Sequence, residues 1–312
     1  FRRVLFRSLY DLPAPAKLNL FLHVIGRRAD GYHLLQSIFT LINWQDTLHL
    51  ECRADGRIQR HDLGPALPAE DLCLRAARAL QQASGCPLGV DISIDKQVPW
   101  GAGLGGGSSD AATVLLGLNR LWDLRWPRER LLALGATLGA DVPFFLGGHT
   151  AFVEGIGEIL TPIELPAGRW AVLKPAAALP TPKIFSSELL TRDTKPVKVA
   201  GLLAELQRQS ETRQTAGKSE ETFWGRNDLQ AAAEALCPDV QQAARLLAER
   251  FGNSRMTGSG SAVFADAGRD YASDTGAGNS PVATTLEGPW PEGWVGRMCR
   301  GLSKHPLGDW VN

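Results

Sequence analysis

The feature that most constrains how this chain can fold is a glycine-rich stretch at residues 101–107, followed directly by Ser108, Ser109 and Asp110. Five glycines in seven residues let the backbone adopt positive φ angles and approach a ligand closely. Because apolar residues follow, we expect a helix to begin at the serines and to extend to about Trp122. Free N–H groups and the positive dipole end of a helix N-terminus attract anions. The stretch therefore predicts a cradle for phosphate oxygens, and the simpler alternative is a flexible turn with a serine cap.

Three other motif interpretations fit the sequence less well. Residues 101–106 match the dinucleotide fingerprint G-x-G-x-x-G, but Pro99 separates them from the preceding strand, which is not the first strand of a βαβ unit. The tripeptide at 217–219 resembles the end of a P-loop, yet no strand leads into it. Residues 93–96 fit S-x-x-K, but the chain has no Lys-Thr-Gly to complete an acyl-transfer site. A nicotinamide-dependent dehydrogenase is therefore the weaker alternative.

The composition limits the class of protein. The chain has 312 residues, which at about 150 residues per domain suits two domains or one large α/β unit. Lys and Arg number 33 and balance 33 Asp and Glu, which argues against a nucleic-acid or membrane partner. Five scattered cysteines without a C-x-x-C pair favour free thiols in a reducing compartment. We expect a cytoplasmic protein that is a monomer or a weak homodimer.

The hydrophobic periodicity predicts an α/β (α+β) fold on a mixed sheet. We expect strands at 17–25, 33–42, 46–51, 90–94, 149–154 and 170–173, with further strand-like residues around 254–257 and 262–265. Helices are expected at 70–83, 108–122, 127–138, 228–236 and 239–250. A change of texture near 165–180 predicts an N-terminal domain at 9–170 and a C-terminal domain at 171–312, after a non-native or disordered leader at 1–8.

Two charged residues in apolar surroundings are candidates for chemistry. Lys17 lies at the start of a strand pattern whose alternation puts it on the same face as Asn19, although a lone lysine there is more often a surface residue. Asp141 stands between Gly-Ala and Val-Pro, where a buried carboxylate needs a partner, and the simpler alternative is a helix cap. A second glycine cluster at 256–262, which contains Gly258, predicts another tight loop against a substrate or a phosphate, although such turns are common at strand ends.

Taken in order, these motifs resemble the superfamily of galactokinase, homoserine kinase, mevalonate kinase and phosphomevalonate kinase. Within it, the sequence is most similar to the 4-diphosphocytidyl-2-C-methyl-D-erythritol kinases of the non-mevalonate isoprenoid pathway. The resemblance spans residues 10–266. Seven motifs carry it: Pro15-Ala16-Lys17-Leu18-Asn19-Leu20-Phe21-Leu22, Arg28-Ala29-Asp30-Gly31-Tyr32-His33, the loop at 99–112, Leu138-Gly139-Ala140-Asp141-Val142-Pro143, Pro180-Thr181-Pro182-x-Ile184-Phe185, Asn227-Asp228-Leu229 and Thr257-Gly258-Ser259-Gly260.

The resemblance implies a two-domain small-molecule kinase with its active site in the cleft between the domains. Asp141 would be the general base, with Lys17 beside it, and Mg²⁺ would bridge the phosphates of ATP with help from Ser108 and Ser109. The residues implied to hold ATP are Lys96, Pro99, Gly101, Gly103, Leu104, Gly105, Gly106, Gly107, Ser108 and Ser109. Those implied to hold the cytidine-diphosphate substrate are Asn19, Tyr32, His33, Thr181, Phe185 and Gly258.

The sequence departs from the family pattern at several places. Asp71 stands where the family usually has Asn, which puts an adenine-edge contact in doubt, and Trp100 is a bulky entry to the loop. The polar stretch at 205–221 has no recognised counterpart. Two alternatives to the implied function stay open: a homoserine- or mevalonate-type kinase, and a nucleotide-binding regulator without activity.

Overall fold

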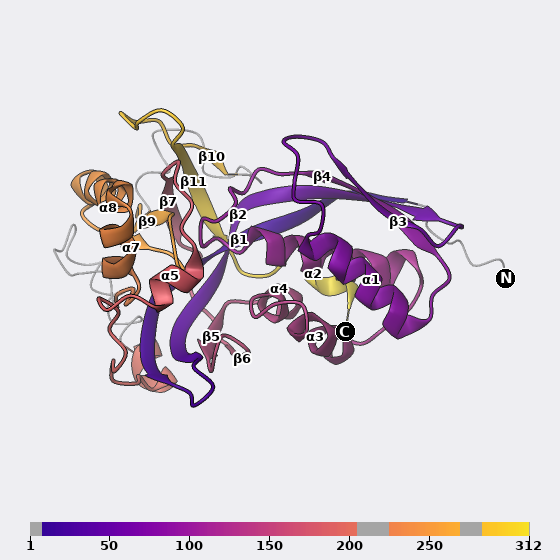
Figure 1. Cartoon of the computed structure of the whole chain (residues 1–312), viewed down its shortest axis with the longest axis horizontal. Helices are drawn as coiled ribbons and strands as arrows, with labels where there is room; N and C mark the ends of the chain where they lie inside the picture. The colour runs from indigo at the N-terminus through magenta and orange to yellow at the C-terminus, as the bar shows by residue number, and fades with distance from the viewer. Residues whose placement is uncertain (1–7, 205–224, 269–282, 312) are drawn as a thin grey trace.

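The fold is built around one long antiparallel hairpin. The computed structural model describes residues 8–204, 225–268 and 283–311. Strand β1 (Ser8–Arg27) pairs along its length with β2 (His33–Arg53), and the two run through the length of the molecule (Figure 1). β1 begins at Ser8, the last residue of the predicted leader, which pairs with Glu51, and residues 1–7 lie outside the described part. The polar stretch at 205–221 lies outside it as well.

The prediction of two separate strands at 33–42 and 46–51 is wrong. The register shifts between the pairs Ala16–Ile42 and Pro15–Gln45, so the residues expected to form a connection form a bulge within one continuous strand. Trp44, in this bulge, is buried and its indole N–H donates to the carbonyl of Gln97. Burial of this side chain explains why the polar residues around it do not form a turn.

Strand β11 joins the two halves of the sheet. The strand order is β3-β4-β2-β11-β7-β9-β8, and β11 (Val295–Leu302) pairs antiparallel with both β7 and β2. The sequence did not predict this strand, because its arginines and glycines break the apolar alternation. The remaining strands of the eleven-stranded sheet are β3 (Ile58–Asp62), β4 (Gly89–Asp95), β5 (Ala151–Glu154), β6 (Ile159–Pro162), β7 (Arg169–Lys174), β8 (Arg255–Met256), β9 (Val263–Asp266) and β10 (Thr284–Thr285).

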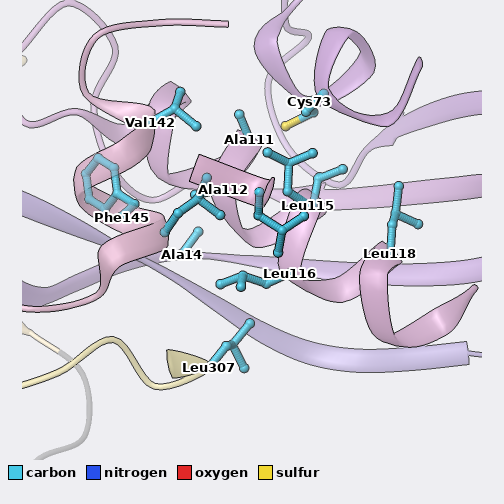
Figure 2. Packing of buried hydrophobic residues seen from close by; sticks show 14 of the residues in the cluster. Ala14, Cys73, Ala111, Ala112, Leu115, Leu116, Leu118, Val142, Phe145 and Leu307 are labelled. Carbon is cyan, nitrogen blue, oxygen red and sulfur yellow. The ribbon is translucent and has the colours of Figure 1, made fainter. Parts of the chain in front are cut away.

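Four helices pack at one end of the sheet: α1 (Leu72–Ser84), α2 (Gly106–Leu121), α3 (Arg128–Ala136) and α4 (Val142–Gly147) (Figure 1). α2 is the centre of this core, and its Leu115 and Leu116 lie among Cys73 of α1 and Ala14 of β1 (Figure 2). Leu307, near the end of the chain, packs in the same core, so the C-terminal segment returns to the N-terminal half. α2 begins at Gly106, two residues before the predicted start at Ser108, because Gly105 takes the left-handed conformation and caps it.

The other end of the sheet carries a second core. Helices α7 (Gln230–Leu236) and α8 (Pro238–Phe251) cover β7 and β9 there, and the short helix α5 (Thr181–Phe185) lies beside them (Figure 1). β1 contributes side chains to both cores and to a third cluster between them, which contains Leu18 and Phe21. The middle of β1 is therefore the point at which the two ends of the molecule meet. Among the described residues, no helix is long and apolar enough to span a membrane.

Candidate active site

Lys17 and Asp141 form an ion pair in the middle of the molecule. Lys17 Nζ lies 3.4 Å from Asp141 Oδ2. The lysine side chain is 4% exposed and the aspartate side chain 30%, so the carboxylate is reached by solvent while the ammonium lies beneath it. Asp141 occupies the N-cap position of α4 but makes no side-chain capping hydrogen bond. The structure therefore places both residues together and leaves the carboxylate free to bind a ligand.

Two further groups fix the ammonium of Lys17. Its Nζ donates to Asn19 Oδ1 at 2.6 Å and lies 4.1 Å from the centre of the Phe39 ring. Asn19 is held in turn by Ser37, to which its amide donates. Burial lowers the pKa of Lys17, and the neighbouring Asp141 opposes that shift. The expectation that Lys17 and Asn19 share one face of the strand is confirmed by their hydrogen bond.

The glycine-rich loop lies directly against this pair. The backbone N–H of Lys17 donates to the carbonyl of Leu104 at 2.9 Å. Gly105 has φ +71°, and a Cβ atom there would stand 3.1 Å from the Lys17 side chain. The first helical hydrogen bond of α2 runs from the N–H of Ser109 to the carbonyl of Gly105, so the N–H groups of residues 106–108 in the first turn have no acceptor within the helix. These donors can bind phosphate oxygens next to Asp141 and Lys17.

The other predicted residues of the loop have distinct places. Ser109 is buried and its hydroxyl donates to the carbonyl of Pro15 at 2.7 Å, so this hydroxyl is used within the protein. Ser108 is partly exposed, which leaves its hydroxyl the better placed of the two for a ligand. Pro99 is partly buried, and Trp100 after it is 79% exposed at the entry to the loop.

The second glycine cluster contacts the first. The N–H of Ala262 donates to the carbonyl of Ala102 at 3.1 Å, and a Cβ atom on Gly258 would lie 2.8 Å from the carbonyl of Gly103. The prediction of a tight loop at 256–262 is confirmed in this geometry. Sequence reasoning missed Thr257, whose hydroxyl accepts the backbone N–H of Asn19 at 2.8 Å. A threonine in a Gly/Ser turn carries no signal that would have singled it out.

Gly103 allows us to test the contact between the two loops. It has φ +75°, and an added Cβ would lie 2.3 Å from the carbonyl oxygen of Thr257. Gly252 has φ +74° with open space around it, so Gly252→Ala is a matched control for backbone strain. We expect Gly252→Ala to lower the free energy of unfolding by about 1–2 kcal/mol. Gly103→Ala should lower it further and should also weaken nucleotide binding. Equal losses in denaturant titrations, with unchanged nucleotide binding, would contradict the contact.

Lys96 lies under the start of α2 in a buried cluster with two carboxylates. Its Nζ donates to Asp110 Oδ2 at 2.6 Å and also to Asp46 Oδ2. Burial lowers the pKa of Lys96, but the two carboxylates outweigh it and raise that pKa. Burial, and then Asp46, raises the pKa of Asp110 well above its ordinary value. The Oδ1 atom of Asp110 is buried without a hydrogen-bond partner among the described residues.

Asp46 is a second residue that sequence reasoning missed. It is fully buried, and its Oδ1 accepts the backbone N–H groups of Gln97 at 2.6 Å and Val98 at 2.7 Å. These bonds fix the segment that leads into the glycine-rich loop. Asp71, which raised doubt about a nucleotide contact, caps α1 through Leu74 and pairs with Arg60 at 3.0 Å. Both of its oxygens therefore have partners within the protein.

The residues predicted to hold the cytidine end of the substrate lie in two places. Tyr32 and His33 lie at the turn between β1 and β2, and Thr181 and Phe185 lie on α5. The rings of His33 and Phe185 stack with centroids 5.1 Å apart and an interplanar angle of 25°. Tyr32, next to His33, is 60% exposed. Thr181 bonds through its hydroxyl to Ser259 in the second glycine cluster at 2.7 Å. The structure thus links α5, which carries Phe185, to the second glycine cluster, and the same cluster binds Asn19 beside Lys17.

The chain is similar to proteins of a known family. The GHMP kinases N terminal domain model matches residues 71–149, and the GHMP kinases C terminal model matches residues 202–273. The 4-diphosphocytidyl-2-C-methyl-D-erythritol kinase of Methylibium petroleiphilum is 61% identical over 98% of this chain and 99% of its own length. The crystal structure of a 4-(cytidine 5'-diphospho)-2C-methyl-D-erythritol kinase is 35% identical, covers 95% of this chain and 100% of its own, and superposes with a TM-score of 0.71.

A more distant solved structure shows the same fold. The mevalonate kinase of Methanococcus jannaschii is 14% identical, covers 97% of this chain and 100% of its own, and has a TM-score of 0.59. The predicted mixed α/β small-molecule-kinase fold is therefore confirmed. The chain belongs to the family of 4-diphosphocytidyl-2-C-methyl-D-erythritol kinases, within the GHMP kinases.

Proposed function

We propose that this chain transfers the γ-phosphoryl group of ATP to the 2-hydroxyl of 4-diphosphocytidyl-2-C-methyl-D-erythritol. The observation that carries the proposal is the Lys17–Asp141 pair, which lies against the glycine-rich loop of a chain 61% identical to a kinase of that name. Asp141 accepts the hydroxyl proton as the attack begins, since its carboxylate is partly exposed and makes no capping bond. Lys17 offsets the negative charge that develops on the transferred group.

The phosphates of ATP fit the glycine-rich loop. The N–H groups of residues 106–108 have no acceptor within α2, and a side chain at Gly103 or Gly105 would collide with Thr257 or Phe145. Lys96, which Asp46 and Asp110 hold in place and whose side chain stays 15% exposed, suits the polar edge of the adenine. These contacts explain why the loop contains glycines and why the charged side chains of Lys96 and Asp110 lie under the start of α2.

A magnesium ion would accompany ATP. Among the residues that the structure describes, no three His, Cys, Asp or Glu side chains are grouped so as to hold a metal ion. Mg²⁺ commonly keeps several waters and binds through substrate phosphates and one or two protein groups, so the protein needs no cage of its own. Of the nearby side chains, the partly exposed Ser108 hydroxyl is an oxygen donor that fits the ion. When bound, the ion neutralises charge on the phosphates.

The stacked pair of His33 and Phe185 suits a nucleobase, which distinguishes this substrate from homoserine and mevalonate. Phe185→Ala is expected to raise the KM for the cytidylyl substrate by roughly 5- to 150-fold, because base–aromatic stacking contributes about 1–3 kcal/mol. The KM for ATP should stay nearly unchanged. Steady-state kinetics check this, with the exposed aromatic Tyr10→Ala as the control. Equal effects of Phe185→Ala on both KM values would contradict the assignment of the aromatic pair.

The test of the proposed function is ADP release with Mg-ATP, coupled to NADH oxidation. The acceptors compared are 4-diphosphocytidyl-2-C-methyl-D-erythritol, homoserine and mevalonate. We expect turnover of about 1–100 s⁻¹ with the first acceptor alone. Turnover with homoserine or mevalonate instead would assign a different substrate to this chain. If protein that binds ATP released no ADP with any of the three acceptors, the alternative of a nucleotide-binding regulator without activity would be favoured. We also propose a cytoplasmic location, which is supported by the five cysteines, all of them free thiols.

A further inference from the structure

We propose that Arg192 is a positioning residue for the cytidine end of the substrate, because it fixes both members of the His33–Phe185 pair. The proposal rests on the proposed function, since that function gives the pair its ligand. Arg192 lies in the segment that follows α5 and was not selected from the sequence. Its guanidinium donates hydrogen bonds both to the turn that carries Phe185 and to the ring of His33.

The guanidinium of Arg192 binds the turn that carries Phe185. One terminal nitrogen donates to the carbonyl of Ser187 at 2.7 Å and to the carbonyl of Phe185 at 3.3 Å. The other donates to the carbonyl of Leu190 at 3.3 Å. Three carbonyls of one short turn therefore surround a planar fork, which is a geometry that arginine provides and lysine does not. The backbone that aims the Phe185 ring is held by this fork.

The Nε–H group of the same guanidinium reaches across to the β1–β2 turn. Arg192 Nε donates to His33 Nε2, with 3.4 Å between the two nitrogens. An imidazole nitrogen that accepts a hydrogen bond carries no proton, so the neutral His33 ring carries its proton on Nδ1. Burial, and then the charges of Arg192 and Arg27, lowers the pKa of His33, which favours this neutral form.

A fixed tautomer has a consequence for recognition. With Nε2 occupied by Arg192, Nδ1–H is the only ring group of His33 that can donate to a ligand, and cytosine presents two adjacent acceptors, O2 and N3. If the proton moved to Nε2, Nδ1 would become an acceptor and could no longer donate a hydrogen bond to O2 or N3 of cytosine. Arg192 thus sets which edge of a pyrimidine His33 can bind, without itself contacting the base.

The tautomer can be measured directly. Long-range ¹⁵N–¹H correlation spectra of ¹⁵N-histidine-labelled protein without substrate should show His33 with its proton on Nδ1, and His33→Gln assigns the signal among the six histidines. In Arg192→Met, we expect a mixture of both tautomers. Arg245→Met removes an equal charge from the surface of α8, where the side chain is 69% exposed, and should leave the His33 signal unchanged. An unchanged His33 signal in Arg192→Met would overturn the proposal.

Kinetics separate positioning from simple charge attraction. Arg192→Met is expected to raise the KM for 4-diphosphocytidyl-2-C-methyl-D-erythritol about tenfold, a difference of about 1.4 kcal/mol, with the KM for ATP within twofold of the wild type. Arg192→Lys keeps the charge but not the fork, so its KM should resemble that of Arg192→Met. Restoration of the wild-type KM by lysine would mean that Arg192 only attracts the diphosphate. Failure of the proposed function is distinct, because the wild-type protein itself would then not use this substrate.

Discussion

Asp141→Asn is expected to lower kcat by roughly 10²–10⁴-fold, which is the usual contribution of general-base catalysis. The amide has nearly the same shape as the carboxylate but cannot take up the proton of the acceptor hydroxyl. The Kd for ATP should stay close to that of the wild type, because the loop that binds the phosphates does not depend on a proton acceptor at residue 141. Steady-state kinetics of ADP release measure kcat, and calorimetric titration with a non-hydrolysable ATP analogue measures the Kd.

An exposed pair of the same residue types supplies the control for this variant. Lys304 Nζ and Asp309 Oδ2 lie 2.5 Å apart, and their side chains are 54% and 76% exposed. Asp309→Asn removes a carboxylate from a lysine just as Asp141→Asn does, but at the surface, where such pairs contribute little. Its kcat should equal that of the wild type. Near-normal turnover in Asp141→Asn would remove Asp141 from the role of base.

The sequence was informative wherever chemistry depends on consecutive residues. The glycine-rich loop, its helix and the second glycine cluster are local patterns, and the structure has all of them, with α2 beginning two residues early. The strand that carries Lys17 and Asn19 was expected from its alternation. Its full length was not, because Pro13 and Pro15 are unusual in strands away from edges and bulges, and β1 pairs with β2 around such bulges.

What the sequence did not predict depends on contacts between distant segments. Asp46 lies in the middle of a strand and bonds to backbone groups of Gln97 and Val98, so its role is set by the pairing of β2 with β4. Arg192 stands in a polar stretch, and only the folded chain brings it to His33, 159 residues earlier. β11 is a strand because β7 and β2 flank it, not because of its own pattern. A one-dimensional pattern carries no signal for such partners.

Lys17→Met is expected to lower kcat by roughly 10²–10³-fold, as does loss of a single group that stabilises charge in a transition state. Methionine fills a similar volume in this buried position, so the protein should fold, and thermal unfolding checks this. The ammonium acts in its protonated form. Because burial lowers its pKa, against the opposing effect of Asp141, the protonated fraction falls as the pH rises through a value below 10.5. The wild-type kcat should therefore decline on the alkaline side below pH 10.5.

The alkaline decline separates a catalytic lysine from a structural one. If Lys17 supplies the charge, Lys17→Met lacks the decline, and its residual kcat is flat over the range in which the wild type loses activity. Lys304→Met, at the exposed pair, should keep both the rate and the decline. If the decline persisted in Lys17→Met, another group would titrate there. A kcat of Lys17→Met within a few fold of the wild type would mean that Asp141 takes up the proton without help from Lys17. The ion pair at 3.4 Å would then stabilise the fold and not the transfer of the phosphoryl group.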